Sequence, residues 1–77
     1  MSAPRPLTTL APGDSARVKD FPKSGPVFLR LREMGLLPGT MLTFVRAAPL
    51  GDPIEIKLRG YNLTLRREEA DRIIVES

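Results

Sequence analysis

The sequence contains no cysteine and no histidine among its 77 residues. Without cysteine the chain can form neither a disulfide framework nor a thiolate zinc site. Without histidine it lacks the commonest general base and the commonest transition-metal ligand. Its serines have no imidazole to activate them, and only oxygen ligands remain, which suit Mg, Ca or Mn better than a tightly held transition metal. We therefore expect no catalytic residue, no metal site and no cofactor, and a protein that acts by binding.

Long apolar runs and a hydrophobic leader are missing as well. The first six residues are polar and contain proline, and the longest apolar runs extend over only a few residues. A membrane-spanning helix needs ~20 apolar residues, and a signal peptide needs an apolar stretch near the N-terminus. These features predict a cytoplasmic protein without direct membrane insertion.

Positive charge is only slightly in excess over negative charge. Twelve Lys and Arg against nine Asp and Glu give a formal net charge of +3, and the aromatic residues are one Tyr and three Phe. The basic residues are spread along the chain and alternate with acidic ones. A dedicated nucleic-acid binder usually concentrates its positive charge and adds stacking aromatics. The sequence therefore disfavours nucleic acid as a partner.

A chain of 77 residues makes one domain. A domain of this size buries only about 60% of the surface that its unfolded form exposes, which leaves few residues for a deep cleft. The sequence has no repeat, no low-complexity tract and no linker that would divide it. We predict that residues 1–6 form a flexible N-terminal tail and that residues 7–77 form the folded domain.

Alternation of apolar and polar residues predicts that this domain is mainly β. In residues 15–20, for example, Ala16 and Val18 face one way and Arg17 and Lys19 the other, as in a half-buried strand. The candidate strands are residues 7–10, 15–20, 40–48, 54–59, 63–66 and 72–76, the first being very short. A single small sheet would leave its apolar face in water. We therefore expect about five strands to curl into a small SH3-like barrel, with one short helix at its end.

One segment follows a helical period instead. Val27, Leu31 and Met34 fall at positions i, i+4 and i+7, which predicts a helix over residues 26–34. Gly35 suits the end of this helix, where a left-handed residue is often needed. Two further predictions are a loop at residues 21–25 and a single helical turn at residues 67–71.

The strands near residues 58 and 63 predict a hairpin with a defined register. If Leu58 faces Leu63, the turn is Gly60-Tyr61, and a two-residue turn with glycine first is typical of type II′. Ile56 then faces Leu65, so that all the apolar positions share one face.

Two turn-rich stretches carry apolar residues that could serve as contacts. Leu36 and Leu37 follow the helix and either pack under the barrel or stay exposed as a docking knob. Leu50 is at the tip of a proline-bracketed loop, which is either a stiff strand connection or a pre-ordered contact that loses little entropy on binding. The predicted partner-binding residues are Met34, Leu36, Leu37, Pro49, Leu50 and Asp52.

The same stretches carry two motifs in a fixed order. Arg-Leu-x-Glu-Met-Gly-Leu-x-Pro-Gly is matched by Arg30, Leu31, Glu33, Met34, Gly35, Leu36, Pro38 and Gly39, and Ala-Pro-Leu-Gly-Asp-Pro by residues 48–53. Similar flanking patterns occur at Leu7, Leu10, Pro12, Gly13 and Asp14, and at Leu65, Arg66, Glu69 and Ala70. In these motifs, and over nearly its whole length, the chain resembles the bacterial ferrous iron transport protein A (FeoA) family.

The resemblance implies an SH3-like fold, a cytosolic location and an accessory or regulatory role in Fe(II) uptake. In that system the small component is thought to bind the cytosolic regions of a larger membrane transporter, which carries a GTP-binding domain. In a sharper form of this hypothesis, Arg46 or Arg59 is an arginine finger that activates GTP hydrolysis. The alternatives are a metal-responsive module that binds a transition metal, as a weak homodimer in one version, and a nucleic-acid-binding small barrel.

Overall fold

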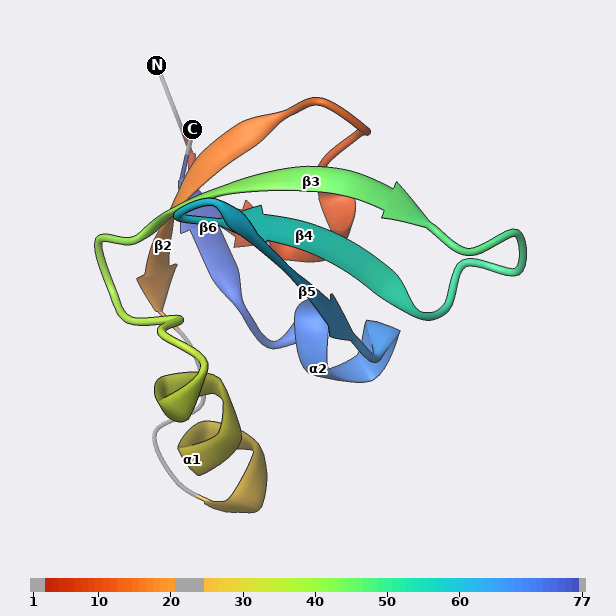
Figure 1. Ribbon diagram of the computed structural model, residues 1–77. Helices are drawn as coiled ribbons and strands as arrows, with labels where there is room; N and C mark the ends of the chain where they lie inside the picture. The colour runs from red at the N-terminus through yellow and green to blue at the C-terminus, as the bar shows by residue number, and fades with distance from the viewer. Residues whose placement is uncertain (1–2, 21–24, 77) are drawn as a thin grey trace.

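The computed structural model describes residues 3–20 and 25–76, which build one curled antiparallel sheet flanked by short helices (Figure 1). Six strands pair in the order β1-β6-β2-β3-β4-β5. The strands are β1 (Arg5–Pro6), β2 (Ser15–Asp20), β3 (Met41–Ala47), β4 (Ile54–Leu58), β5 (Tyr61–Leu65) and β6 (Ile74–Glu76). The helices are the 3-10 helix η1 (Leu7–Thr9) and the α-helices α1 (Gly25–Glu33) and α2 (Arg67–Asp71).

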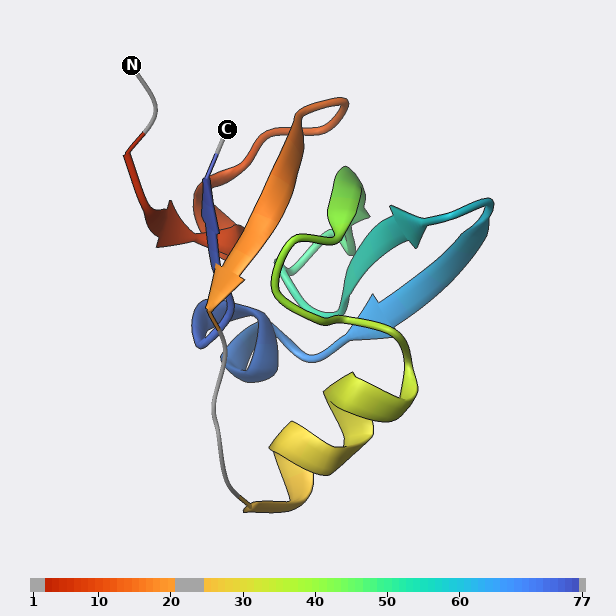
Figure 2. The same ribbon diagram turned by 90° about the vertical axis from the view of Figure 1, so that its left-hand side faces the viewer.

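Alternation along the strands forms the core, as predicted. The buried strand residues are Ala16, Val18, Leu42, Phe44, Ile54, Ile56, Leu58, Leu65 and Val75. Figures 1 and 2 show that the sheet is strongly bent. The predicted class, mainly β and SH3-like, is confirmed, but the sheet has six strands and is not a closed barrel. Among the described residues no pairing joins β1 to β5, so both remain edge strands.

The N-terminal segment differs from its prediction. Arg5 and Pro6, predicted as part of a flexible tail, pair with Val75 and Ile74 of β6. Residues 7–10, predicted as a strand, instead contain η1. The reason is that Leu7 and Leu10 are both buried. Residues three apart point to opposite faces of a strand, but a 3-10 helix has three residues per turn and brings them to one side.

The predicted register of the β4–β5 hairpin is wrong by two residues. Leu58 pairs with Tyr61, so the turn is Arg59-Gly60 rather than Gly60-Tyr61. Both turn residues have positive φ, 42° and 90°, as a type I′ turn requires. A shift of two residues keeps every side chain on its face, and therefore alternation alone could not distinguish the two registers.

Helix α1 lies below the sheet in Figures 1 and 2 and contributes the buried Leu31 to the core. Gly35 follows the helix with a φ of 90°, which confirms the predicted glycine stop. Residues 21–24 of the predicted loop, and the side chains of Val27 and Phe28, lie outside the described part of the structure. No helix in that part is long and apolar enough to cross a bilayer.

The two leucines after Gly35 have opposite environments. Leu36 is 0% exposed and belongs to the core, whereas Leu37 is 43% exposed. Leu36 therefore has no surface to offer a partner, and its prediction as a contact residue is corrected. Leu36 therefore follows the alternative of packing in the core, and Leu37 follows the alternative of staying exposed.

The two leucines should respond differently to truncation. We expect Leu36→Ala to lower the free energy of unfolding by about 2–5 kcal/mol, because it leaves a cavity in a small core. Leu37→Ala is the matched control and should change it by less than about 0.5 kcal/mol. Urea unfolding of both variants measures the difference, and equal losses would contradict the assigned burial.

Candidate functional site

The two predicted contact stretches lie at opposite ends of the molecule. In Figure 1 the β3–β4 loop extends to the right, whereas the turn after α1 lies at the left. Figure 2, seen from that left side, has the turn in front. The structure therefore does not join residues 34–37 and residues 49–53 into one surface, and they form two separate candidate contacts.

Hydrogen bonds hold the 34–37 turn in one conformation. The Leu36 N–H donates to the Leu31 carbonyl at 3.0 Å, and the Thr40 N–H donates to the Leu37 carbonyl at 3.0 Å. Met34 is partly buried and packs against the core. Leu37 is thus the part of the turn that a partner can reach.

Tyr61 supports this turn, a role that its sequence position did not indicate. Its hydroxyl donates a hydrogen bond to the Met34 carbonyl. Gly35 lies directly beneath it, since a Cβ atom at Gly35 would be 3.1 Å from the Tyr61 hydroxyl oxygen. This contact follows from the observed hairpin register, which makes Tyr61 the first residue of β5 rather than a turn residue.

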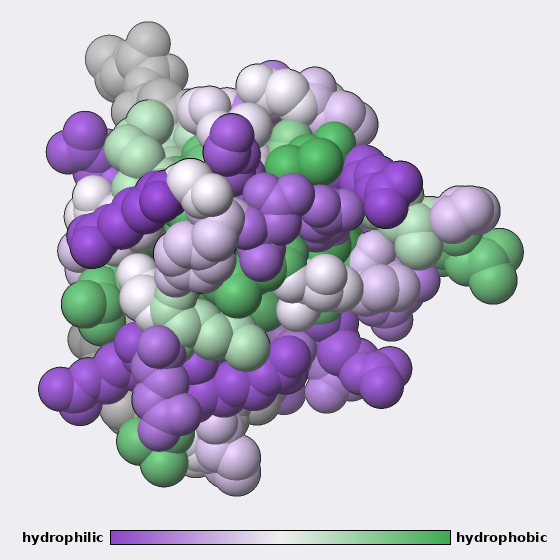
Figure 3. All heavy atoms as spheres, in the orientation of Figure 1, coloured by the Kyte–Doolittle hydropathy of each residue, from purple (hydrophilic) through white to green (hydrophobic). Residues whose placement is uncertain are grey.

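The loop of residues 49–53 presents one apolar side chain. Leu50 is 96% exposed at its tip, where Figure 3 shows a green, hydrophobic projection over the β3–β4 loop. The Ala48 N–H donates to the Pro53 carbonyl at 2.9 Å, and the Gly51 N–H donates to the Ala48 carbonyl at 2.7 Å. Pro49 is exposed beside the tip. The loop is therefore closed by its own backbone, and Leu50 points into solvent.

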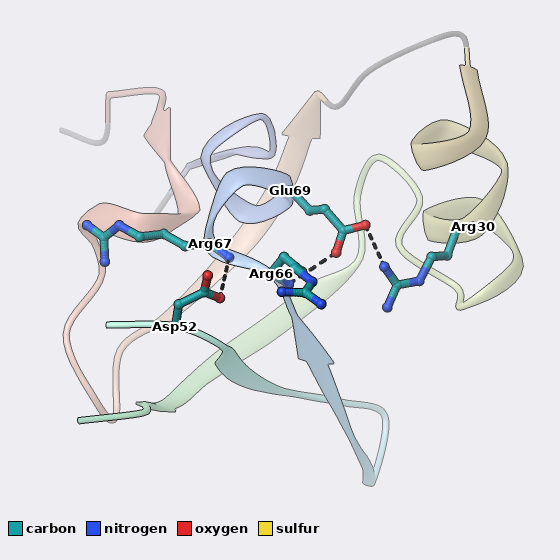
Figure 4. Close-up of polar contacts among 5 residues, drawn as sticks. All are labelled: Arg30, Asp52, Arg66, Arg67 and Glu69. Carbon is teal, nitrogen blue, oxygen red and sulfur yellow. Dashed lines mark hydrogen bonds and ion pairs between the residues drawn. The ribbon is translucent and has the colours of Figure 1, made fainter. Parts of the chain in front are cut away.

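Asp52 anchors this loop to the start of α2. Its Oδ1 atom accepts a hydrogen bond from the Arg67 N–H at 2.9 Å (Figure 4). The Arg67 guanidinium reaches back and donates to the Gly51 carbonyl at 3.4 Å. The first N–H groups of a helix have no partner within the helix, which explains why a carboxylate is favourable here. Asp52 thus positions the loop.

Glu69 makes the equivalent connection on the other side of α2. Its Oε1 atom accepts a hydrogen bond from the Arg66 N–H at 3.1 Å, and its Oε2 atom pairs with Arg30 of α1 at 2.5 Å (Figure 4). The Glu69 side chain is only 10% exposed. A carboxylate at this depth requires such partners. The sequence placed Glu69 in the single helical turn predicted at residues 67–71 but did not indicate these contacts.

An open hollow of about 460 Å³ lies beside these contacts. Its lining is Arg30, Asp52, Pro53, Thr64, Leu65 and Arg66. The one carboxylate in this lining, Asp52, accepts the Arg67 N–H and thereby helps to hold the loop. Among the described residues no group of three acidic side chains is placed to hold a metal ion.

A third carboxylate, that of Glu55, is held on the exposed face of the sheet. Glu55 accepts hydrogen bonds from the Asn62 side-chain amide at 2.6 Å and from the Arg46 guanidinium at 3.0 Å. These two donors, Asn62 first and Arg46 second, hold the pKa of Glu55 below its ordinary value of 4.5. Arg46, one of the two arginines considered as a finger, is thus already paired.

Comparison with known proteins gives one consistent result. The model of the FeoA domain family matches residues 5–77. The Fe(2+) transport protein A/Fe(2+) transporter FeoB fusion protein of Porphyromonas gingivalis is 40% identical over 70 residues, which are 91% of this chain and 8% of the relative. The chain therefore corresponds to a small part of that protein.

Solved structures similar to this chain include two iron(II) transport proteins of the FeoA type. Iron(II) transport protein A from Clostridium thermocellum is 46% identical with a TM-score of 0.87, over 92% of this chain and 44% of that chain. FeoA from Stenotrophomonas maltophilia, complexed with zinc, is 30% identical with a TM-score of 0.74, over 91% of this chain and 87% of that chain. That protein is described as a prokaryotic SH3 domain protein and as a candidate activating factor of ferrous iron transport.

Removing the Glu69 carboxylate should loosen the attachment of α1. We expect Glu69→Ala to lower the free energy of unfolding by about 1–3 kcal/mol, because an N–H of the α2 start and Arg30 lose their charged partner. Glu68→Ala, at the exposed neighbouring position, is the control and should stay within about 0.5 kcal/mol. Chemical denaturation compares the two variants. An unchanged free energy of unfolding in Glu69→Ala would show that the contacts of Glu69 do not stabilise the fold.

The carboxyl of Glu55 should titrate below 4.5 in the folded protein. Because its folded pKa is lowered, the contribution of Glu55 to stability is present above the unfolded pKa and is lost as the pH falls through the folded value. Carbon-detected NMR titration measures this pKa. Asn62→Ala should raise it towards the ordinary value, whereas the distant Arg72→Gln should leave it in place, and an unshifted pKa in Asn62→Ala would contradict the assigned cause.

Proposed function

This chain belongs to the FeoA domain family, and from that membership we propose that it is a cytosolic accessory protein of ferrous iron uptake that binds the cytosolic region of the ferrous iron transporter. The family is associated with ferrous iron transport. The fusion of the P. gingivalis relative to a FeoB transporter supports association between this domain and a transporter. Binding, rather than turnover, also agrees with an accessory domain that has no histidine or cysteine.

The observation that carries the proposal is the exposure of Leu50. Leu50 is 96% exposed, on a loop that is closed by two backbone hydrogen bonds. Burial of its side chain against a partner would stabilise the complex by about 25 cal/mol per Å² of apolar area. The loop is also tied to α2 through Asp52, so that little conformational freedom is lost when a partner binds. We propose Leu50, with Pro49 beside it, as the principal contact with the transporter.

Leu37 is proposed as a second, separate contact. It is exposed on a turn held by Tyr61 and by backbone hydrogen bonds. Because this turn and the loop of Leu50 lie at opposite ends of the molecule (Figure 1), the two leucines do not form one continuous patch. A partner that contacts both residues would have to extend along the whole domain, or two partners would have to bind.

A metal-responsive role is less well supported. The described residues gather no group of three acidic side chains that could hold a metal ion, and the sequence supplies neither imidazole nor thiolate. The S. maltophilia relative is complexed with zinc, but zinc in that protein does not show that this chain has ligands for it. We therefore propose no metal site.

Binding to the purified cytosolic region of the transporter tests the proposal. Leu50→Asp should weaken binding by about tenfold or more, or ~1.4 kcal/mol, because it places a charge in an apolar contact. Leu29→Asp is the matched control, since Leu29 is 56% exposed on α1, away from the Leu50 loop. Isothermal titration calorimetry measures both. Wild-type affinity in Leu50→Asp would reject the loop as the contact, and absence of binding by the wild-type chain would reject the proposed function.

A further inference from the structure

The two sides of the sheet differ in charge. The outer face is defined here as the exposed side of the strands together with the β4–β5 turn at its rim. Its basic residues are Arg17, Lys19, Arg46, Lys57 and Arg59, and its acidic residues are Asp20, Glu55 and Glu76. Elsewhere in the described chain six acidic residues balance six basic ones. The outer face is therefore net positive, and the rest of the described molecule has no net charge.

Two of the three carboxylates of the outer face form ion pairs with cations of the same face. Glu76 pairs with Lys19 at 3.1 Å, and Glu55 pairs with Arg46 at 3.0 Å. Three further cations, Arg17, Lys57 and Arg59, have no ion pair with any described residue and are all exposed.

The sheet register brings these cations close together. Arg17 is opposite Met41 on β3, and Thr43, two residues further along β3, is opposite Lys57 on β4. Neighbouring strands are about 4.8 Å apart, so Arg17 and Lys57 stand on either side of β3. Met41, which is opposite Arg17, is 50% exposed. The face thus combines a cluster of cations with one flexible apolar side chain.

The aromatic residues whose side chains are described do not contribute to this face. Phe44 is buried in the core, and the Tyr61 hydroxyl bonds to the Met34 carbonyl under the sheet. Single-stranded nucleic acids are usually bound by aromatic platforms beside positive charge. A lipid headgroup layer needs only the positive charge, with an apolar side chain such as that of Met41 at the boundary.

We propose that the outer face docks on the anionic headgroups of a lipid bilayer. The choice of a lipid surface rests on the proposed function, which brings this chain next to a membrane transporter. Headgroup phosphates would pair with Arg17, Lys57 and Arg59, and the interaction stays at the surface without insertion of a helix. Because Leu37 and Leu50 are not part of this face, the domain can bind the membrane and the transporter at the same time.

Vesicle binding by the full chain tests this inference. The chain should bind vesicles of phosphatidylcholine mixed with phosphatidylglycerol and should not bind pure phosphatidylcholine. Each basic residue near an anionic surface changes partitioning by roughly fivefold, so that Lys57→Gln with Arg59→Gln should reduce it by roughly 20- to 30-fold. High salt should have a similar effect, because it shortens the Debye length from about 10 Å at 0.1 M to about 3 Å at 1 M.

Arg32→Gln with Arg72→Gln is the matched control. It removes the same total charge from exposed positions outside the outer face and should keep most of the binding. Thermal unfolding verifies that each variant is folded, and Arg17→Gln alone, expected to lose about fivefold, provides a second test on another strand.

Three results would overturn the inference. They are equal binding to vesicles with and without phosphatidylglycerol, equal losses in the two double variants, and binding to single-stranded oligonucleotides but not to vesicles. Leu50→Asp separates this inference from the proposed function, since it should leave vesicle binding unchanged while it weakens binding to the transporter. Vesicles without transporter detect the lipid contact even if the transporter is not the partner.

Discussion

The carboxylate of Glu69 connects α1 to the body of the protein. It accepts the Arg66 N–H at the start of α2 and pairs with Arg30, 39 positions away in the sequence. Asp52 does the same for the next N–H group, that of Arg67. A helix of five residues therefore holds α1 on one side and the β3–β4 loop on the other. The two carboxylates bind the N–H groups at the start of α2, which have no partner within the helix.

Two kinds of surface result from this arrangement. The exposed leucines, Leu37 and Leu50, are single apolar side chains on turns fixed by hydrogen bonds. The outer face of the sheet is instead a cluster of cations on neighbouring strands. Apolar contacts favour a protein partner whose shape fits them, whereas clustered charge favours any surface of opposite sign. The two proposed kinds of contact therefore use different parts of the surface.

Most of the core was predictable, because alternation is a local signal. Val18 and Ile56, for example, are buried as predicted, and the hairpin kept its faces although its register was wrong by two residues. Predictions about individual side chains whose surroundings come from distant parts of the sequence were less successful. Leu36 and Leu37 are adjacent and chemically identical, and only the fold decides which is buried. Asp52 stays a predicted partner contact, and the hydrogen bond that its carboxylate accepts from a backbone N–H 15 residues away could not be read from the sequence.

The sequence by itself determined the class of the fold, the set of apolar side chains available to the core and the lack of imidazole and thiol chemistry, since composition and periodicity do not depend on distant contacts. Only the tertiary structure decided that the two turn-rich stretches lie at opposite ends, that Glu69 is buried, and that cations scattered along the chain meet on one face. The physical reason is that strand register and helix placement bring together residues far apart in sequence. Charge, burial and exposure at a surface depend on those neighbours.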